Sequence, residues 1–160
     1  MYVFGHQEVN ELDKHREIGK YISILQRLNN MFFANRLSSF QIGCGQQFFL
    51  LQIFKNPGMN FHELALNGHY DKATATRAVK KLEEEGYVRT ETEEGDKRVR
   101  RIYLTDLAKP VVEKTMECVD EWAEIILEGL TGEERQEAEQ LLIRMAANAH
   151  QFNAKQKGKE

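Results

Sequence analysis

A single change in the spacing of apolar residues constrains the fold of this chain more than any other feature. Up to Gly86, and again after Thr105, apolar side chains recur at the three- and four-residue intervals of amphipathic helices. Between these points the period changes to two. Residues 87–92 and 100–104 therefore predict two strands, with turn-forming residues at 93–96. We expect a mainly α fold that contains one small β-hairpin.

Six helical segments are expected around the hairpin, because only Pro57 and Pro110 interrupt helix formation. The first, over about residues 8–36, extends about 40 Å at about 1.5 Å per residue, which is longer than a small core requires. Pro110 lies in the second turn of the fifth, where it is expected to remove a backbone hydrogen bond or bend the helix. The other segments are expected at about 45–54, 62–66, 71–85, 105–130 and 131–152.

Capping residues place a helix-turn-helix before the hairpin. Asn60 can cap the third segment, and Asp71 can accept hydrogen bonds from the first amides of the fourth. Gly86 supplies a left-handed residue where the fourth segment ends. Two helices joined by a glycine-containing turn, residues 67–69, are typical of a helix-turn-helix. A third capping signal, Thr131 followed by Glu134, begins the last helix.

The net charge of −3 hides an uneven distribution. Residues 72–101 carry nine basic and seven acidic side chains, whereas residues 102–160 carry seven basic and twelve acidic ones. A basic segment within a neutral-to-acidic chain favours a polyanionic partner for that segment alone.

The helix expected at 71–85 has two distinct faces. Its apolar stripe predicts burial of Ala75, Ala78, Val79 and Leu82. The opposite face combines cations, which attract phosphates and donate to guanine edges, with small side chains that allow close approach to bases. The residues of this face are Lys72, Ala73, Thr76, Arg77 and Lys80.

The hairpin carries cations at and after its tip. Lys97 and Arg98 come directly after the turn, and Arg100 and Arg101 follow. An arginine on a projecting hairpin can enter a narrow minor groove, and Asp96 can hold Arg98 extended through a paired hydrogen bond. A helix-turn-helix followed by a basic hairpin predicts a winged helix.

Residues 71–88 resemble the recognition helix and first wing strand of the MarR family (multiple antibiotic resistance regulators). The family's wing signature, Asp-x-Arg followed by five residues and Leu-Thr, is matched by Asp96, Arg98, Leu104 and Thr105. The order of elements agrees over about residues 8–152. The resemblance implies a winged helix-turn-helix flanked by N- and C-terminal dimerisation helices.

By this resemblance, residues 1–160 form one MarR-like domain. Residues 8–36 and 105–152 are the dimerisation helices, 45–104 the DNA-binding lobe, and 153–160 a frayed tail. The resemblance implies a homodimeric repressor of pseudo-palindromic double-stranded operators, released by a small-molecule effector. It places Lys72, Thr74, Thr76, Arg77, Lys80, Asp96 and Arg98 at the DNA, and the helix face and hairpin described above add Ala73, Lys97 and Arg100 as DNA-binding candidates.

Two departures from the family pattern are visible. Residues 42–45, Ile-Gly-Cys-Gly, stand where a threonine or serine usually caps the second helix, and the wing carries Glu91, Glu93 and Glu94. The acidic wing leaves open a winged-helix module that binds protein instead of DNA. A cysteine-based redox regulator is a further alternative, since Cys44 lies near a helix N-terminus, whereas Cys118 is expected to be buried.

Other sites are expected to be few. If an effector binds in the family's cleft between the lobes, Cys44, Phe48 and Phe49 are candidate contacts, although paired phenylalanines favour the core. The five histidines show no metal-ligand spacing, and no nucleophile–base pair or phosphate-binding loop is present, so we expect no enzyme, metal or cofactor. With no spanning apolar run, no secretory signal and no disulfide framework, we expect a cytoplasmic protein without a membrane partner.

Overall fold

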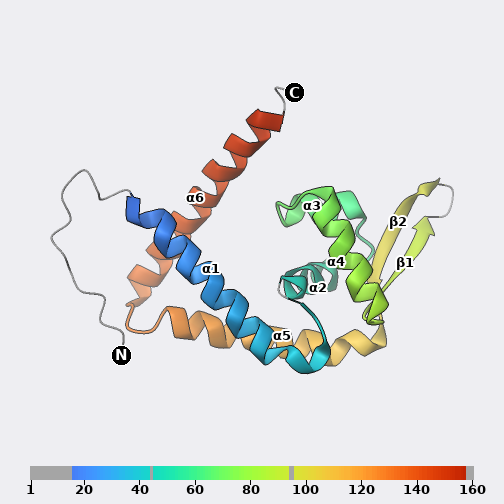
Figure 1. Ribbon diagram of the computed structural model, residues 1–160, viewed down its shortest axis with the longest axis horizontal. Helices are drawn as coiled ribbons and strands as arrows, with labels where there is room; N and C mark the ends of the chain where they lie inside the picture. Colours follow the sequence, from blue (N-terminus) through green and yellow to red (C-terminus); the bar gives the residue numbers. More distant parts are fainter. Residues whose placement is uncertain (1–15, 44, 94–95, 158–160) are drawn as a thin grey trace.

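The computed structural model describes residues 16–43, 45–93 and 96–157, with the backbone alone for residues 16, 96–98 and 156–157. Two lobes are visible in Figure 1, with α5 running along one edge from one to the other. The first lobe contains α2 (Gln46–Lys55), α3 (Phe61–Asn67), α4 (Lys72–Glu84), β1 (Val88–Glu93) and β2 (Asp96–Leu104). The second contains α1 (Arg16–Arg36), α5 (Lys109–Ile126) and α6 (Gly132–Lys157). The expected mainly α fold with one hairpin is confirmed.

The first lobe is built on a continuous hydrophobic core to which the start of α5 contributes. Burial of one leucine, isoleucine or valine side chain stabilises the fold by about 1.5–3 kcal/mol relative to full exposure. Fully buried members are Leu50, Ile53, Leu64, Leu82, Ile102 and Val111. Because α2, α3, α5 and the hairpin all pack on this core, α4 is held rigidly by its buried face.

The hairpin is antiparallel, with Val88 opposite Leu104 and a bulge after Thr92. Its base is closed by Thr105, whose Oγ1 donates a hydrogen bond to the Gly86 carbonyl oxygen at 2.6 Å. Gly86 has a φ of 79°, a left-handed conformation that favours glycine. The strand β2 begins at residue 96, four positions before the predicted strand, because backbone pairing continues where the apolar alternation has ended.

The expectation for Pro110 is wrong. Residues Asp106–Ala108 form a short 3₁₀ helix, and α5 begins at Lys109, so Pro110 lies in the first turn of α5. An amide at this position has no partner within a helix, and the proline ring favours the helical φ. Pro110 therefore lies where a proline removes no hydrogen bond from the helix.

The last helix begins as its capping residues predict. Thr131 N donates to Glu134 Oε2 at 2.8 Å, and Glu134 N donates to Thr131 Oγ1 at 3.3 Å. The helix continues to Lys157, past residue 152, where the sequence predicts a frayed tail. Alanine, lysine and glutamine are strong helix formers, and they occupy all four positions from 154 to 157.

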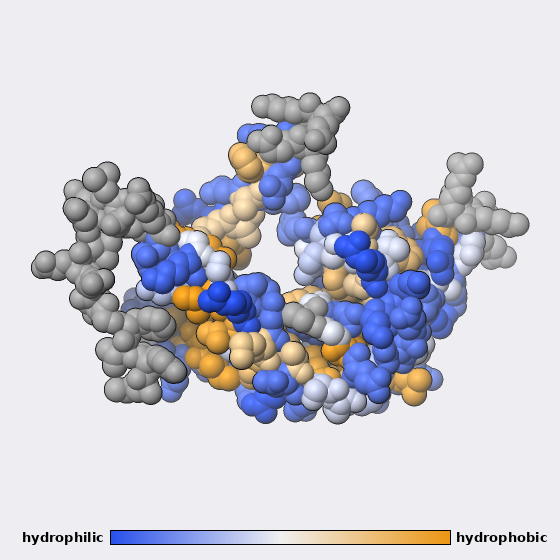
Figure 2. All heavy atoms as spheres, in the orientation of Figure 1, coloured by the Kyte–Doolittle hydropathy of each residue, from blue (hydrophilic) through white to orange (hydrophobic). Residues whose placement is uncertain are grey.

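Apolar side chains remain exposed on the second lobe. Figure 2 shows hydrophobic residues gathered where α1 crosses α5 and α6, whereas the visible face over α4 and the strands is mostly hydrophilic. The exposed apolar residues of α1 share one face; they include Ile18, Ile22, Leu25 and Leu28. Others lie on α5 and α6, including Met116, Ile125, Leu141 and Leu142. No helix in the described ranges is both long and apolar enough to cross a membrane.

Candidate nucleic-acid interface

Two capped helices form the helix-turn-helix. Asn60 Oδ1 accepts hydrogen bonds from the amides of His62 and Glu63, each at 2.9 Å, and Glu63 Oε2 accepts from Asn60 N at 2.8 Å. At the start of α4, Asp71 Oδ1 accepts from Thr74 N at 2.8 Å. Both caps lie where the sequence predicts them. They fix the starts of α3 and α4 independently of any ligand.

The two faces of α4 are confirmed. Ala75, Ala78, Val79 and Leu82 are buried against the core. Thr74 is half-buried, and the remaining side chains of the predicted face are exposed. These exposed residues are Lys72, Ala73, Thr76, Arg77 and Lys80.

Hydrogen bonds within the first turns of α4 orient part of this face. Thr74 Oγ1 donates to Asp71 Oδ2 at 2.7 Å, and Arg77 Nη2 donates to Thr74 Oγ1 at 3.0 Å. Thr76 Oγ1 donates back to the Lys72 carbonyl oxygen at 2.7 Å, so its methyl group is left toward solvent. The result is an exposed helix face with directed donors and a small apolar contact point.

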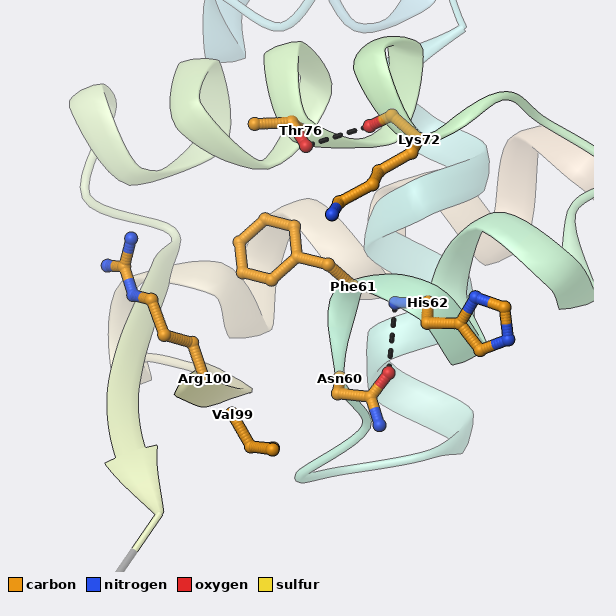
Figure 3. Close-up of a pocket in the computed structure, with 7 residues that line it drawn as sticks. All are labelled: Asn60, Phe61, His62, Lys72, Thr76, Val99 and Arg100. Carbon is orange, nitrogen blue, oxygen red and sulfur yellow. Dashed lines mark hydrogen bonds between the residues drawn. The ribbon is translucent and has the colours of Figure 1, made fainter. Parts of the chain in front are cut away.

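A hollow of about 410 Å³ lies beside α4. Figure 3 shows Lys72 and Thr76 on α4 above it, Phe61 at its centre and Arg100 on β2 at its far side. Two cationic side chains, one from α4 and one from β2, therefore lie on either side of the solvent-open hollow. The participation of Asn60, Phe61 and His62 was not predicted, because sequence spacing does not show that the start of α3 faces β2.

Arg100 is oriented toward α4 by its neighbours. Its Nη2 lies 3.9 Å from Glu83 Oε1, forms a hydrogen bond with Thr90 Oγ1, and its guanidinium carbon lies 6.0 Å from the ring centre of Phe61. Arg100 on β2 is thereby brought beside the exposed face of α4. The side chains of Asp96, Lys97 and Arg98 lie outside the described residues, although their backbone belongs to β2.

Two acidic residues of the hairpin, Glu91 and Glu93, are paired with hairpin arginines. Glu93 accepts two hydrogen bonds from Arg101 Nη2, at 2.9 and 3.0 Å. Arg101 Nη1 also donates to the Gly58 carbonyl oxygen at 3.2 Å, and Glu91 forms an ion pair with Arg89. Because Glu91 and Glu93 are each matched by a cation, their charges are largely compensated within the hairpin.

Two of the three candidate effector contacts, Phe48 and Phe49, pack against other aromatic rings. Phe49 is 4% exposed with its ring centre 4.5 Å from that of Tyr70, and Phe48 is half-buried with its ring 6.0 Å from that of Phe33. Gln47 precedes Phe48 in the first turn of α2. Its side-chain nitrogen, Nε2, is buried without a hydrogen-bond partner in the described part of the chain. Cys44 lies outside the described residues.

The second helix begins without a hydroxyl cap. Gly45 takes the capping position with a φ of 89°, and Gln46 Oε1 accepts a hydrogen bond from Gly43 N at 2.6 Å. The other cysteine, Cys118, is buried on α5 as predicted, and burial raises the pKa of its thiol. A raised thiol pKa lowers the thiolate fraction and disfavours a redox role for Cys118.

The capped helix pair, the exposed helix face and the adjoining hairpin define a winged helix-turn-helix protein of the transcriptional-regulator class. Residues 45–99 match the model of the MarR family. The chain is 31% identical over 133 residues to the uncharacterized HTH-type transcriptional regulator YybA of Bacillus subtilis (strain 168). The match covers 83% of this chain and 86% of that protein. The chain belongs to the MarR family.

Solved structures share the fold. A MarR transcriptional regulator from Methanosarcina mazei Go1 superposes with a TM-score of 0.77 at 31% identity, covering 86% of this chain and 99% of that one. A mutant MarR from E. coli complexed with operator DNA gives a TM-score of 0.74 at 21% identity, over 86% of this chain and 99% of that one. The sequence-based resemblance is therefore confirmed at the level of family and fold.

Proposed function

We propose that this chain is a homodimeric, sequence-specific DNA-binding regulator that represses transcription and is released by a small-molecule effector. One observation carries the proposal. The exposed face of α4 combines cations with small side chains and continues into a hollow flanked by Lys72 and Arg100. Such a face can approach bases closely and neutralise phosphates at its edge. The E. coli MarR mutant, which has the same fold and is complexed with operator DNA, supports DNA as the partner.

In this mode α4 lies in the major groove. Arg77 and Lys80 are suited to guanine edges or phosphates, and the exposed Ala73 and the methyl of Thr76 can contact thymine methyl groups. Lys72 and Arg100 are suited to a phosphate that crosses the hollow, because they approach it from two sides. At the tip of the hairpin, Arg98 is proposed to enter the adjacent minor groove.

The second lobe is proposed to form the dimer. Its exposed apolar face on α1, α5 and α6 is unusual for a monomer, since contiguous apolar patches commonly mark interaction sites. A two-fold axis through this lobe presents α4 twice. Two recognition helices about 34 Å apart then meet successive major grooves of a pseudo-palindromic operator.

The effector is proposed to bind where the lobes meet. The unpartnered amide of Gln47 can donate a hydrogen bond to a carboxylate or carbonyl oxygen, and the half-buried ring of Phe48 can contact an apolar body. An effector that favours a different separation of the two α4 helices lowers operator affinity by its preference for that state. Cytoplasmic location follows from this proposal.

Operator selection followed by binding measurements tests the proposal. Purified protein should enrich an inverted repeat from a randomised DNA pool, with half-site centres about 10 base pairs apart. In fluorescence anisotropy with that operator, Arg77→Ala should weaken binding by roughly 5- to 150-fold, which corresponds to about 1–3 kcal/mol. Lys80→Ala should also reduce the salt dependence by about one released ion.

The control is Arg144→Ala, which removes one exposed cation from α6 and should leave operator affinity unchanged within about twofold. Enrichment of no DNA at low salt would contradict the proposal and favour a protein-binding winged helix. Equal affinities of Arg77→Ala and the unmodified protein would show that α4 does not read the DNA.

A further inference from the structure

Two histidines from opposite lobes are in ring contact. The ring centres of His69 and His150 are 4.4 Å apart, and their planes meet at 58°. His69 lies in the turn between α3 and α4, two residues before Asp71, whereas His150 lies in the C-terminal half of α6. This ring contact joins α6 to the turn before α4, whereas α5 connects the lobes along one edge of the molecule (Figure 1).

The surroundings of the pair leave it accessible. Both histidines are exposed, and neither imidazole ring has a hydrogen bond or ion pair with another described residue. On α6, the neighbours one turn away from His150 include Ala146, Ala147 and Ala154, whose small side chains leave room beside the imidazole. Nothing in the proposed DNA interface or dimer requires two imidazoles here.

We propose that His69 and His150 together bind a divalent transition-metal ion, such as Ni²⁺ or Zn²⁺, that ties α6 to the turn before α4. Imidazole nitrogen is a preferred ligand of these ions, at about 2.0–2.1 Å for zinc. Rings already in contact need only side-chain rotations to direct one nitrogen each at a shared ion. No group of three or more metal-ligating side chains exists among the described residues, so water completes the coordination.

The ion has a structural consequence that does not depend on the proposed operator binding. It joins α6 to the turn from which α4 begins, in addition to the contact between the rings, and it lowers the freedom of that turn. Because the ion binds the folded arrangement alone, it stabilises the fold by an amount that grows with the logarithm of the free ion concentration above the dissociation constant. The site therefore predicts both metal binding and a tighter attachment of the two lobes.

Calorimetric titration of tag-free protein with Ni²⁺ tests the proposal. We expect one ion per chain, and a rise in Tm of about 5–10 °C at a hundredfold excess over the dissociation constant. His69→Asn and His150→Gln should each abolish this binding and this rise. Asparagine is chosen at position 69 because the backbone there has a φ of 54°, which asparagine tolerates.

The matched control is His62→Gln, which removes an exposed histidine that lies elsewhere on α3 and should leave Ni²⁺ binding unchanged. Absence of Ni²⁺ binding at millimolar concentration would overturn the proposal, as would full binding by both the His69 and His150 variants. Amide exchange tests the tie separately: Ni²⁺ should slow exchange in residues 66–71 of the unmodified protein. Bound Ni²⁺ with unchanged exchange there would contradict the link between lobes.

Discussion

The carboxylate of Asp71 accepts two hydrogen bonds from Thr74, one from the backbone nitrogen at 2.8 Å and one from Oγ1 at 2.7 Å. Thr74 Oγ1 in turn accepts a hydrogen bond from Arg77. A single carboxylate therefore caps α4 and, through Thr74, orients an arginine of its exposed face. The same carboxylate therefore stabilises the start of α4 and helps to fix the position of Arg77, a proposed DNA contact.

This link predicts an acid-sensitive contribution to stability. Hydrogen bonds from the Thr74 side chain, and then from its backbone amide, lower the pKa of Asp71. The stabilisation is therefore complete above the unfolded-state pKa of about 3.9 and is lost as the pH falls through the lower folded-state pKa. The difference in unfolding free energy between the unmodified protein and Asp71→Ala should be constant above about pH 5 and shrink below pH 4.

Urea unfolding followed by circular dichroism between pH 3 and pH 7 measures this difference. Asp71→Asn is the matched control, because asparagine keeps a hydrogen-bond acceptor for the Thr74 amide but does not titrate. Its difference from Asp71→Ala should therefore not depend on pH. A constant difference between the unmodified protein and Asp71→Ala down to pH 3 would show that the cap does not act as an ionised carboxylate.

A second prediction concerns the attachment of the hairpin to the segment after α1. Tyr87 Oη donates to the Phe40 carbonyl oxygen at 2.9 Å, across the junction of the two lobes. Tyr87→Phe should lower the free energy of unfolding by about 0.5–1.5 kcal/mol, the usual net contribution of one hydrogen bond. Tyr103→Phe is the control, since its hydroxyl has no hydrogen bond within the described ranges, and it should change stability by less. Equal losses in the two variants would contradict the role of the Tyr87 bond.

A third prediction tests the core beneath α4. Leu82 is fully buried, so Leu82→Ala should cost about 2–5 kcal/mol through lost burial and a residual cavity. Leu107, which is 65% exposed, provides the control, and Leu107→Ala should change the free energy of unfolding by no more than about 0.5 kcal/mol. Thermal and urea unfolding measure both. A small loss in Leu82→Ala would mean that the face of α4 is not fixed by its burial.

Local features of the fold were predictable from sequence, and long-range ones were not. The caps at Asn60 and Asp71 and the buried stripe of α4 depend on residues within one or two turns, so their spacing alone reveals them. The start of α5 was misplaced because the rule for Pro110 depends on which turn holds it, and a three-residue 3₁₀ helix shifted that turn.

The candidate site divides in the same way. The exposed side of α4 follows from periodicity, but the orientation of Arg100 toward Glu83 depends on how the hairpin folds against the helix. The pairing of Glu93 with Arg101 likewise depends on hairpin register, so an acidic wing read from composition overstates its negative charge. The contact of His69 with His150 has no sequence signal, because packing of two lobes brings them together.

A fourth prediction addresses the proposed dimer. Ile22 is 48% exposed on the apolar face of α1, and a charge there would be buried without a partner in a dimer. Ile22→Glu should therefore convert the dimer to a monomer in sedimentation analysis. Ser23→Glu adds the same charge to the exposed polar face of α1, opposite the apolar stripe, and should leave the dimer intact. A monomeric unmodified protein, or dimeric Ile22→Glu, would contradict the proposed interface.

The last prediction separates the tip of the hairpin from its base. Arg98 lies on β2 near the turn, whereas Arg89 lies near the base on β1, beside the ring of Tyr103 at 4.9 Å. Each change to alanine removes one positive charge, so a purely long-range attraction would weaken operator binding equally in both variants. If Arg98 enters the minor groove, Arg98→Ala should lose roughly tenfold or more in affinity, and Arg89→Ala much less. Arg89 is exposed, so Arg89→Ala should keep the unmodified Tm, and a Tm measurement on Arg98→Ala checks that this variant is also folded. Equal affinities of the two variants, measured by anisotropy at one salt concentration, would exclude a specific contact by Arg98 and leave the hairpin as a source of charge alone.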